Sequence, residues 1–170
     1  MSKIIVLYDA CVLYPAPLRD ILMHLALTTL FQAKWSAAIH EEWIRNVLKN
    51  RPDLRREQLE RTRTLMDTHV QDCIVEGYEV LVESVELPDP DDRHVLAAAI
   101  VGKANLIITF NLKDFPQIAL QPYHIKAQHP DIFIAGLMDM HLDDVCMAVK
   151  RHRASLKNPP KSVTEYLHIL

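Results

Sequence analysis

The segment from Leu87 to Phe115 constrains the fold of this 170-residue chain more than any other part of it. It opens with aspartates between prolines, which the interior of a helix does not tolerate. Residues 95–100 then carry apolar side chains at helical spacing, and residues 106–109 form a continuous apolar, β-branched run, typical of a strand buried on both faces. A short helix that leads into a buried strand indicates a parallel sheet, and such sheets bind ligands at the carboxyl ends of their strands.

The same alternation of strands and helices extends over most of the chain. Strands are expected at residues 3–8, 34–36, 80–85, 106–109 and 124–128. Helices are expected at residues 19–30, 37–48 after Ser36 as N-cap, 53–70, 95–100, 131–140, 143–154 and 163–170. This pattern predicts an α/β fold, a three-layer α/β/α domain with a central parallel sheet and a helical C-terminal extension.

Length and composition narrow the possible functions. The length fits a single domain over residues 1–170, with a core at about residues 3–128 and the extension at about residues 129–170. A net charge of −3 means that binding of a polyanion needs a local basic patch or bound cations. P-loop and Rossmann sites lose their main support, because neither G-x-x-x-x-G-K-[ST] nor G-x-G-x-x-G occurs. Three widely spaced cysteines, with no signal-peptide pattern and no apolar run of membrane-spanning length, predict a cytoplasmic protein without membrane contact.

Four acidic residues are expected at one edge of the predicted sheet. Asp9 directly follows the first strand, Glu42 lies early on the second helix, Asp92 precedes the helix at residues 95–100, and Asp114 follows the next strand. Clustered carboxylates repel one another and raise each other's pKa, so the group is unfavourable without a cation. Mg²⁺ or Mn²⁺ removes this repulsion, because both ions prefer oxygen ligands. The residues therefore predict metal-assisted hydrolysis of a phosphodiester.

Four sequence motifs resemble those of a known family. They are Ile5-Val6-Leu7-Tyr8-Asp9-Ala10, Ser36 followed by Glu41-Glu42, Asp92-Arg93-His94-Val95-Leu96-Ala97-Ala98-Ala99, and Thr109-Phe110-Asn111-Leu112-Lys113-Asp114-Phe115. In series, over about residues 4–116, they are similar to PIN-domain proteins and to the VapC-type toxins of bacterial and archaeal toxin–antitoxin pairs. The tail from Ser155 to Pro160 also resembles a subgroup of PIN proteins with a helical C-terminus.

The resemblance implies a PIN-like α/β/α fold and a Mg²⁺- or Mn²⁺-dependent endoribonuclease, the toxin of a type II toxin–antitoxin pair. It implies an RNA substrate, a cognate antitoxin protein and a homodimer. Asp9, Glu42, Asp92 and Asp114 would hold the metal and carry catalysis. Adjacent residues leave the assignment open between Glu41 and Glu42, between Asp91 and Asp92, and between Asn111 and Asp114, and Thr109 and His94 are further candidates at this site.

Several residues have simpler interpretations beside the functional ones. Cys11 is interpreted as a small buried residue, and Trp35 and Trp43 as core or dimer-contact residues. The arginines of residues 53–70 are expected on a solvated helix face. The densest basic run is a candidate RNA contact, although positive charge also suits the C-terminus of a helix: Lys150, Arg151, His152, Arg153, Lys157 and Lys161.

Two alternatives to a nuclease follow from the same sequence. A phosphorylation-dependent receiver domain needs an acidic pair after the first strand, whereas Asp9 stands alone there. A PIN-like domain that no longer cleaves, and that serves as an RNA- or protein-binding module, remains as the alternative. Retention of four acids favours an active site over a decayed one.

Overall fold

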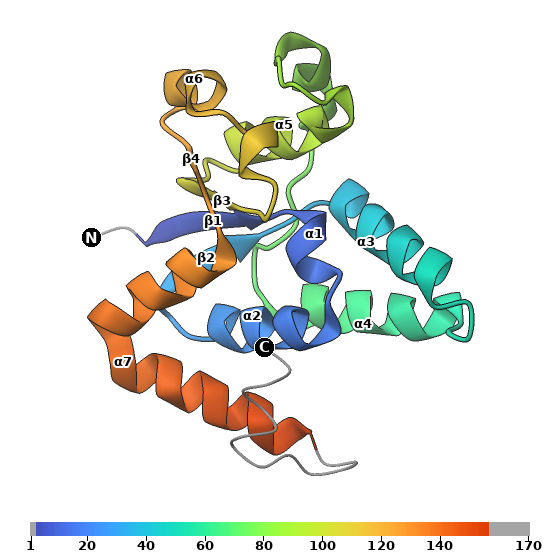
Figure 1. Cartoon of the computed structure of the whole chain (residues 1–170), viewed down its shortest axis with the longest axis vertical. Coiled ribbons are helices and arrows are strands. Elements are labelled where there is room, and N and C mark those ends of the chain that lie inside the picture. Colours follow the sequence, from blue (N-terminus) through green and yellow to red (C-terminus); the bar gives the residue numbers. More distant parts are fainter. Residues whose placement is uncertain (1–2, 157–170) are drawn as a thin grey trace.

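The computed structural model describes residues 3–156, and its centre is a parallel sheet of four strands in the order β2-β1-β3-β4 (Figure 1). The strands are β1 (Ile4–Tyr8), β2 (Phe31–Lys34), β3 (Leu106–Ile108) and β4 (Lys126–Gln128). β1 pairs with β2 and β3, and β3 pairs with β4, all in parallel. The predicted α/β class with a parallel sheet is confirmed.

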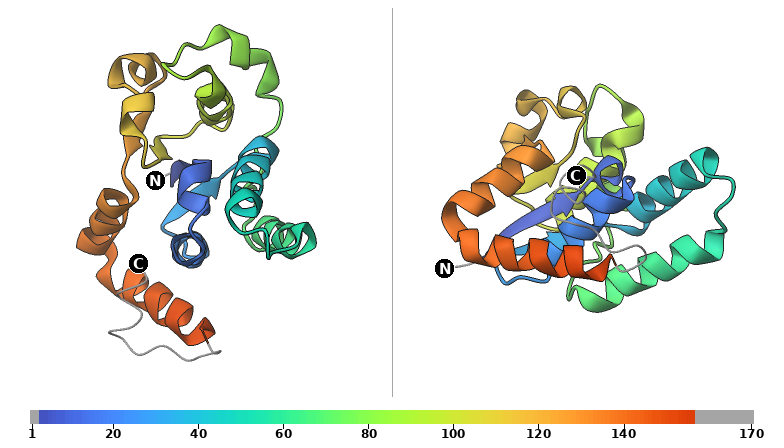
Figure 2. Two further views of the ribbon diagram at one scale, coloured as in Figure 1. Left: turned by 45° about the vertical axis from the view of Figure 1, so that its right-hand side comes forward. Right: turned by 60° about the horizontal axis from the view of Figure 1, so that its bottom comes forward.

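Helices cover both faces of this sheet. In Figures 1 and 2, α5 and α6 lie on one side of the sheet and α2 on the other, while α3 and α4 pack together beside it. The helices are α1 (Ala10–Leu13), α2 (Ala16–Ala26), α3 (Ala37–Asn50), α4 (Arg56–His69), α5 (Arg93–Val101), α6 (Gln117–Leu120) and α7 (Pro130–Ser155). Short 3₁₀ helices are η1 (Glu79–Ser84), η2 (Pro90–Asp92), η3 (Leu112–Asp114) and η4 (Gln121–Tyr123).

The core is built around β1. Val6, Leu7 and Tyr8 are completely buried, as expected for a central strand with helices on both sides. The ring of Tyr8 stacks on Trp35, with centroids 6.1 Å apart, and its hydroxyl donates to the carbonyl of Leu22 at 3.0 Å. Trp35 is itself fully buried, so β1, the end of β2 and α2 share one apolar centre.

The C-terminal extension packs along α2. At its start, the ring of Phe133 meets Phe31 edge-on, with centroids 5.1 Å apart. Helix α7 breaks at His141, whose φ of −142° and ψ of 52° are not helical, so the two predicted helices at 131–140 and 143–154 are the two halves of α7. The predicted helix at residues 163–170 lies outside the described residues. No helix within residues 3–156 has the length and apolar character needed to cross a membrane.

Two strand predictions were wrong. Residues 80–85 form η1 rather than a strand, and η1 packs against α5 instead of joining the sheet. Val80 is 81% exposed, so the β-branched residues that suggested a strand have no neighbouring strand to pack on. The strand expected at residues 34–36 lies earlier, as β2, and Trp35 extends it only by an isolated bridge to Ile74.

The strand order places a crevice at one position on the sheet edge. From β1 the chain goes to β2 on one side, and the later strands β3 and β4 are added on the other side. The connections after β1 and β3 therefore lead away from each other, and at such a switch point the carboxyl ends of two adjacent strands form an opening for ligands. Asp9 and Thr109 follow these two strands directly.

Candidate active site

Asp9 is the buried acid at the centre of the sheet edge. It is 2% exposed and follows β1 directly. Its Oδ1 accepts a hydrogen bond from the amide of Ala10 at 2.7 Å, and its Oδ2 accepts one from the hydroxyl of Thr109 at 2.8 Å. Burial raises the pKa of Asp9, whereas the hydrogen bonds lower it. Asp9 caps α1, but its second oxygen is fixed across the switch point by the neighbouring strand.

Thr109 and Cys11 hold Asp9 in this orientation. The hydroxyl of Thr109 donates to Asp9 and accepts from the amide of Asn111 at 3.0 Å. The Sγ atom of Cys11 lies 3.5 Å from Oδ2 of Asp9. Burial, followed by the charge of Asp9, raises the pKa of Cys11 to about 12, so the thiol remains protonated and donates. The sequence named Thr109 as a candidate but gave Cys11 only a packing role.

Asp92 is an acid whose environment disfavours its charge. It occupies the N-cap position of α5, yet its carboxylate makes no capping hydrogen bond. Its pKa is raised to about 7, first by burial and then by the negative charges around it, those of Asp9, Asp89, Asp114 and Glu42. The other three predicted acids, Asp9, Glu42 and Asp114, therefore all lie close enough to act on Asp92.

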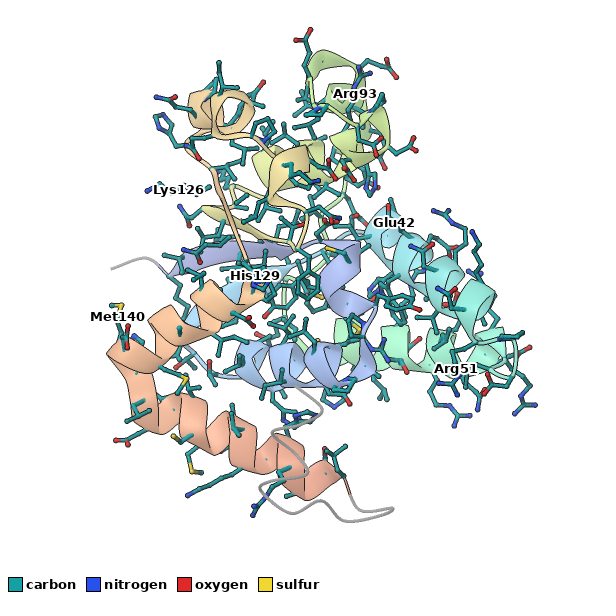
Figure 3. The ribbon with its side chains drawn as sticks, in the orientation of Figure 1. Glu42, Arg51, Arg93, Lys126, His129 and Met140 are labelled. Carbon is teal, nitrogen blue, oxygen red and sulfur yellow. The ribbon has the colours of Figure 1, made fainter. Side chains whose placement is uncertain are left out.

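Glu41 and Glu42 face different neighbours although they are adjacent on α3. Arg56 of α4 donates to both oxygens of Glu41, at 2.6 and 2.8 Å, and Arg63 donates at 3.3 Å. The hydrogen bond from Arg56 is the main reason that the pKa of Glu41 is lowered. The Oε1 atom of Glu42 instead lies 3.4 Å from Nε2 of His94 on α5. Figure 3 shows Glu42 at the end of α3 that is nearest α5. Glu41 therefore ties α3 to α4, whereas Glu42 faces the start of α5.

The remaining candidates lie in the turns beside this group. Asp114 ends η3, is half-buried, and its charge reaches Asp92. Asn111 is exposed, and its backbone amide is bound by Thr109. Asp91 is exposed, and its amide donates to the carboxylate of Asp89 at 2.9 Å.

An open groove of about 690 Å³ runs between α3 and the start of α5. Five of the predicted candidates line it: Glu41, Glu42, Asp91, Asp92 and His94. The polar lining residues that the sequence analysis did not select are Arg45, Asn46 and Asp89. Arg45 and Asn46 stand three and four residues after Glu42, on the same face of α3. This helical spacing was the available signal for both. The groove thus carries one exposed cation beside its acids.

The basic run that was a candidate RNA contact lies elsewhere. Lys150 and Arg151 are exposed on the C-terminal half of α7, whereas His152 is buried. In Figures 1 and 2 this half of α7 and α5 lie at opposite ends of the molecule. Lys157 and Lys161 lie outside the described residues. The described part of the basic run is therefore separate from the groove.

The donor chemistry of the acidic group fits a hard divalent cation. Within residues 3–156, no three histidine, cysteine, aspartate or glutamate side chains stand close enough together to form a ready-made metal site. Mg²⁺, however, usually takes only one or two carboxylates directly and keeps several waters. Asp92, with a raised pKa and no capping hydrogen bond, is a carboxylate that such an ion would stabilise.

Comparison with known families identifies the fold. The family described as the PIN domain matches residues 5–113, which include β1, β3 and all of the acids Asp9, Glu42 and Asp92. The chain belongs to the PIN domain family. A second family, described as the VapC50 C-terminal domain, matches residues 130–170, beginning at the first residue of α7. The resemblance predicted from the sequence motifs is confirmed, both for the PIN domain and for the helical C-terminus.

Part of this PIN-domain protein is similar to a curated relative. The relative is named "Putative ribonuclease VapC50", from Mycobacterium tuberculosis (strain ATCC 25618 / H37Rv), and is 56% identical over 50 residues. The match covers 29% of this chain and 30% of the relative, so it spans less than a third of either protein. No solved structure shows a significant match.

Proposed function

We propose that this PIN-domain protein is a Mg²⁺- or Mn²⁺-dependent endoribonuclease and the toxin of a type II toxin–antitoxin pair. The observation that carries the proposal is the position of Asp92, which makes no capping hydrogen bond and lies close to the charges of Asp9, Asp114 and Glu42. A fold gains nothing in stability from collecting unpaired acids, so the arrangement points to a cation that binds them. The similarity to a protein named as a ribonuclease supports RNA as the substrate.

In this proposal Asp9, Glu42, Asp92 and Asp114 hold the metal. When bound, Mg²⁺ or Mn²⁺ supplies positive charge to the phosphate and lowers the pKa of a water. Thr109 and Cys11 position Asp9, because the hydroxyl of Thr109 and the thiol of Cys11 both donate to its Oδ2 atom, at 2.8 and 3.5 Å. His94 is a positioning residue for Glu42, at 3.4 Å from Oε1.

Arg45 gives the groove a means of binding the substrate backbone. It is exposed on the wall of the groove, one turn beyond Glu42, and has no ion-pair partner among residues 3–156. A guanidinium binds phosphate oxygens in a forked geometry. Since the chain as a whole is negatively charged, attraction of an RNA backbone depends on such local cations and on bound metal.

Cleavage of single-stranded RNA tests the proposal directly. Purified protein should cleave it with Mg²⁺ or Mn²⁺, lose activity in EDTA, and regain it on addition of the metal. Asp9→Asn should abolish cleavage. Asp53→Asn is the matched control, because Asp53 is an exposed aspartate paired only with Arg51. An Asp9→Asn protein as active as the wild type would refute the site. A folded wild type that binds RNA without cleaving it would favour the inactive binding module.

The toxin role has a separate test. Expression of the chain alone should slow bacterial growth, and Asp92→Asn should relieve the effect at equal protein levels. Co-expression of the product of the adjacent reading frame should also restore growth, and it should co-purify with the chain as its antitoxin. Unimpeded growth with abundant folded wild-type protein would contradict the toxin role. The proposal also includes a homodimer and a cytoplasmic location, which light scattering and cell fractionation would test.

A further inference from the structure

Phe110 is an aromatic residue at the candidate active-site edge of the sheet whose side chain is not part of the buried core. It directly follows Thr109, and 41% of its surface is exposed. Single exposed apolar residues are common and need no explanation. Phe110 differs in that its ring has an aromatic partner, His129, with centroids 5.1 Å apart and planes at 70°. Phe110 follows β3 and His129 follows β4, so the pair continues the same edge from which Asp9 projects.

The loop that carries Phe110 is tied to the residues that hold Asp9. The amide of Phe110 donates to Sγ of Cys11 at 3.4 Å, and the next amide, that of Asn111, donates to the hydroxyl of Thr109 at 3.0 Å. Cys11 and Thr109 both contact Oδ2 of Asp9. The backbone position of Phe110 is therefore set by the hydrogen bonds of the acidic centre. An exposed ring at a fixed offset from a reactive group is suited to recognition of the substrate.

The hydrogen bond at Nδ1 of His129 defines the tautomer of its neutral ring. Its Nδ1 accepts a hydrogen bond from the amide of Asp131 at 3.1 Å, which caps α7. In the neutral ring the proton is then on Nε2, which has no partner among residues 3–156 and is available to donate. Figure 3 shows His129 at the junction between β4 and α7. The pair thus offers an aromatic face and, beside it, one hydrogen-bond donor.

We propose that Phe110 and His129 form a base-binding shelf that takes one unpaired RNA base next to the bond to be cleaved. This inference rests on the proposed function and adds to it how the enzyme holds single-stranded substrate. Every base has a π face, so stacking on an aromatic side chain tolerates different sequences, while the free N–H of His129 adds a polar contact. Lys113, exposed in the same turn, provides a cation for the adjoining backbone.

Binding of short fluorescein-labelled single-stranded RNA, measured by anisotropy in an Asp9→Asn background, isolates this contact from cleavage. Phe110→Ala should weaken binding by about 5-fold to 100-fold, the range for loss of one stacked base. Phe110→Trp should retain binding, and His129→Asn, which keeps an N-cap acceptor, should cause a smaller loss. Tyr123→Ala is the matched control: Tyr123 is 40% exposed but precedes β4, at the opposite end of the strand, so its loss should not matter.

A backbone-only probe separates stacking from charge. An abasic ribose-phosphate oligomer of the same length should bind the Phe110→Ala variant and its parent equally. In the active Asp9 background, Phe110→Ala should raise KM more than it lowers kcat. Equal affinity of Phe110→Ala and its parent for base-bearing RNA would overturn the shelf, as would an equal loss for abasic RNA. Metal-dependent cleavage that persists in that case would leave the proposed function intact. A protein that neither binds nor cleaves single-stranded RNA would contradict both.

Discussion

Two carboxylates beside α3 have opposite surroundings. Asp67 of α4 accepts hydrogen bonds from Nε1 of Trp35 and Nε2 of His40, both at 2.8 Å, so it has donors from two other elements. Asp92 has no capping hydrogen bond and is surrounded by other acids, which raise its pKa to about 7. The comparison shows that Asp67, a carboxylate that takes part in packing, has hydrogen-bond donors for its charge. Asp92, in contrast, carries no capping hydrogen bond although it lies among other acids beside the switch point of the sheet.

The hydrogen bonds around Asp67 also fix which ring nitrogen of His40 carries the proton. Nε1 of Trp43 donates to Nδ1 of His40 at 3.0 Å, so the proton of His40 is on Nε2, which donates to Asp67. His40 is completely buried, and burial is the main reason that its pKa is lowered. A second proton would oppose the N–H of Trp43. The two regions therefore respond to pH in opposite directions, which makes the comparison testable.

The largest effect is expected for Asp92→Asn. If Asp92 holds the metal as proposed, its loss should reduce cleavage by about 100-fold or more, since even partners outside the ligand sphere commonly cost 10- to 100-fold. Without metal, however, the unfolding temperature at neutral pH should stay level or rise, because the substitution removes repulsion. Activity assays and thermal unfolding check the two parts. A strong loss of stability would instead mean that Asp92, like Asp67, has a structural role.

The next effect is expected for Asp67→Ala, in stability rather than in activity. The change leaves the indole N–H of Trp35 and the N–H of His40 without their acceptor, which should cost about 2–3 kcal/mol in the free energy of unfolding. Cleavage per folded molecule should remain close to that of the wild type at a temperature where the variant is folded. Urea titration gives the free energy, and Asp53→Ala should leave it unchanged.

A smaller contrast is expected between the adjacent residues Glu41 and Glu42. Glu42→Gln should lower activity by about 10- to 100-fold and weaken activation by Mn²⁺, as for a disturbed metal site. Glu41→Gln should leave activity near the wild-type level and cost at most about 1 kcal/mol, because its partners Arg56 and Arg63 lie on a partly exposed face. Metal titrations of cleavage measure the difference. The reverse result would assign the metal-binding role to Glu41 instead of Glu42.

The smallest effects are expected from pH in EDTA. The pKa of His40 in the folded chain is below its ordinary value of 6.5, so its contribution to stability is present above pH 6.5 and is lost as pH falls below it. The pKa of Asp92 is about 7 against an ordinary 3.8, so its contribution is present below about pH 4 and is lost as pH rises to 7. Asp92 is only half-buried, so solvent screens its interactions and the full shift in its pKa does not appear as stability. As pH falls from 7, the two titrations should move the unfolding temperature in opposite directions.

Variants separate these two titrations. Asp92→Asn should remove the loss of stability between pH 4 and 7, and added Mg²⁺ should stabilise the wild type more at pH 8 than at pH 5. His40→Gln should remove the loss on acidification, at the cost of a lower overall stability. If both variants kept the pH profile of the wild type, neither group would be responsible for it.

Local sequence was sufficient for the elements with self-contained signals. The apolar run before Asp9 predicted β1, Ser36 predicted the start of α3, where its hydroxyl accepts from the amide of Ile39 at 3.2 Å, and the run at residues 106–109 predicted β3. Residues 80–85 failed because β propensity needs a neighbouring strand, and here the segment meets a helix.

The sequence by itself determined the fold class, the family and the set of acids from which an active site can be built, because these depend on periodicity and on residue type along the chain. Only the tertiary structure decided which acids are neutralised. Glu41 is paired by arginines from α4, about one helix further along the chain, whereas Glu42 faces α5. The aromatic partner that meets Phe110 edge-on, His129, likewise follows the neighbouring strand β4. Such pairings depend on how segments that are far apart in the sequence pack together, and no local sequence pattern encodes that packing.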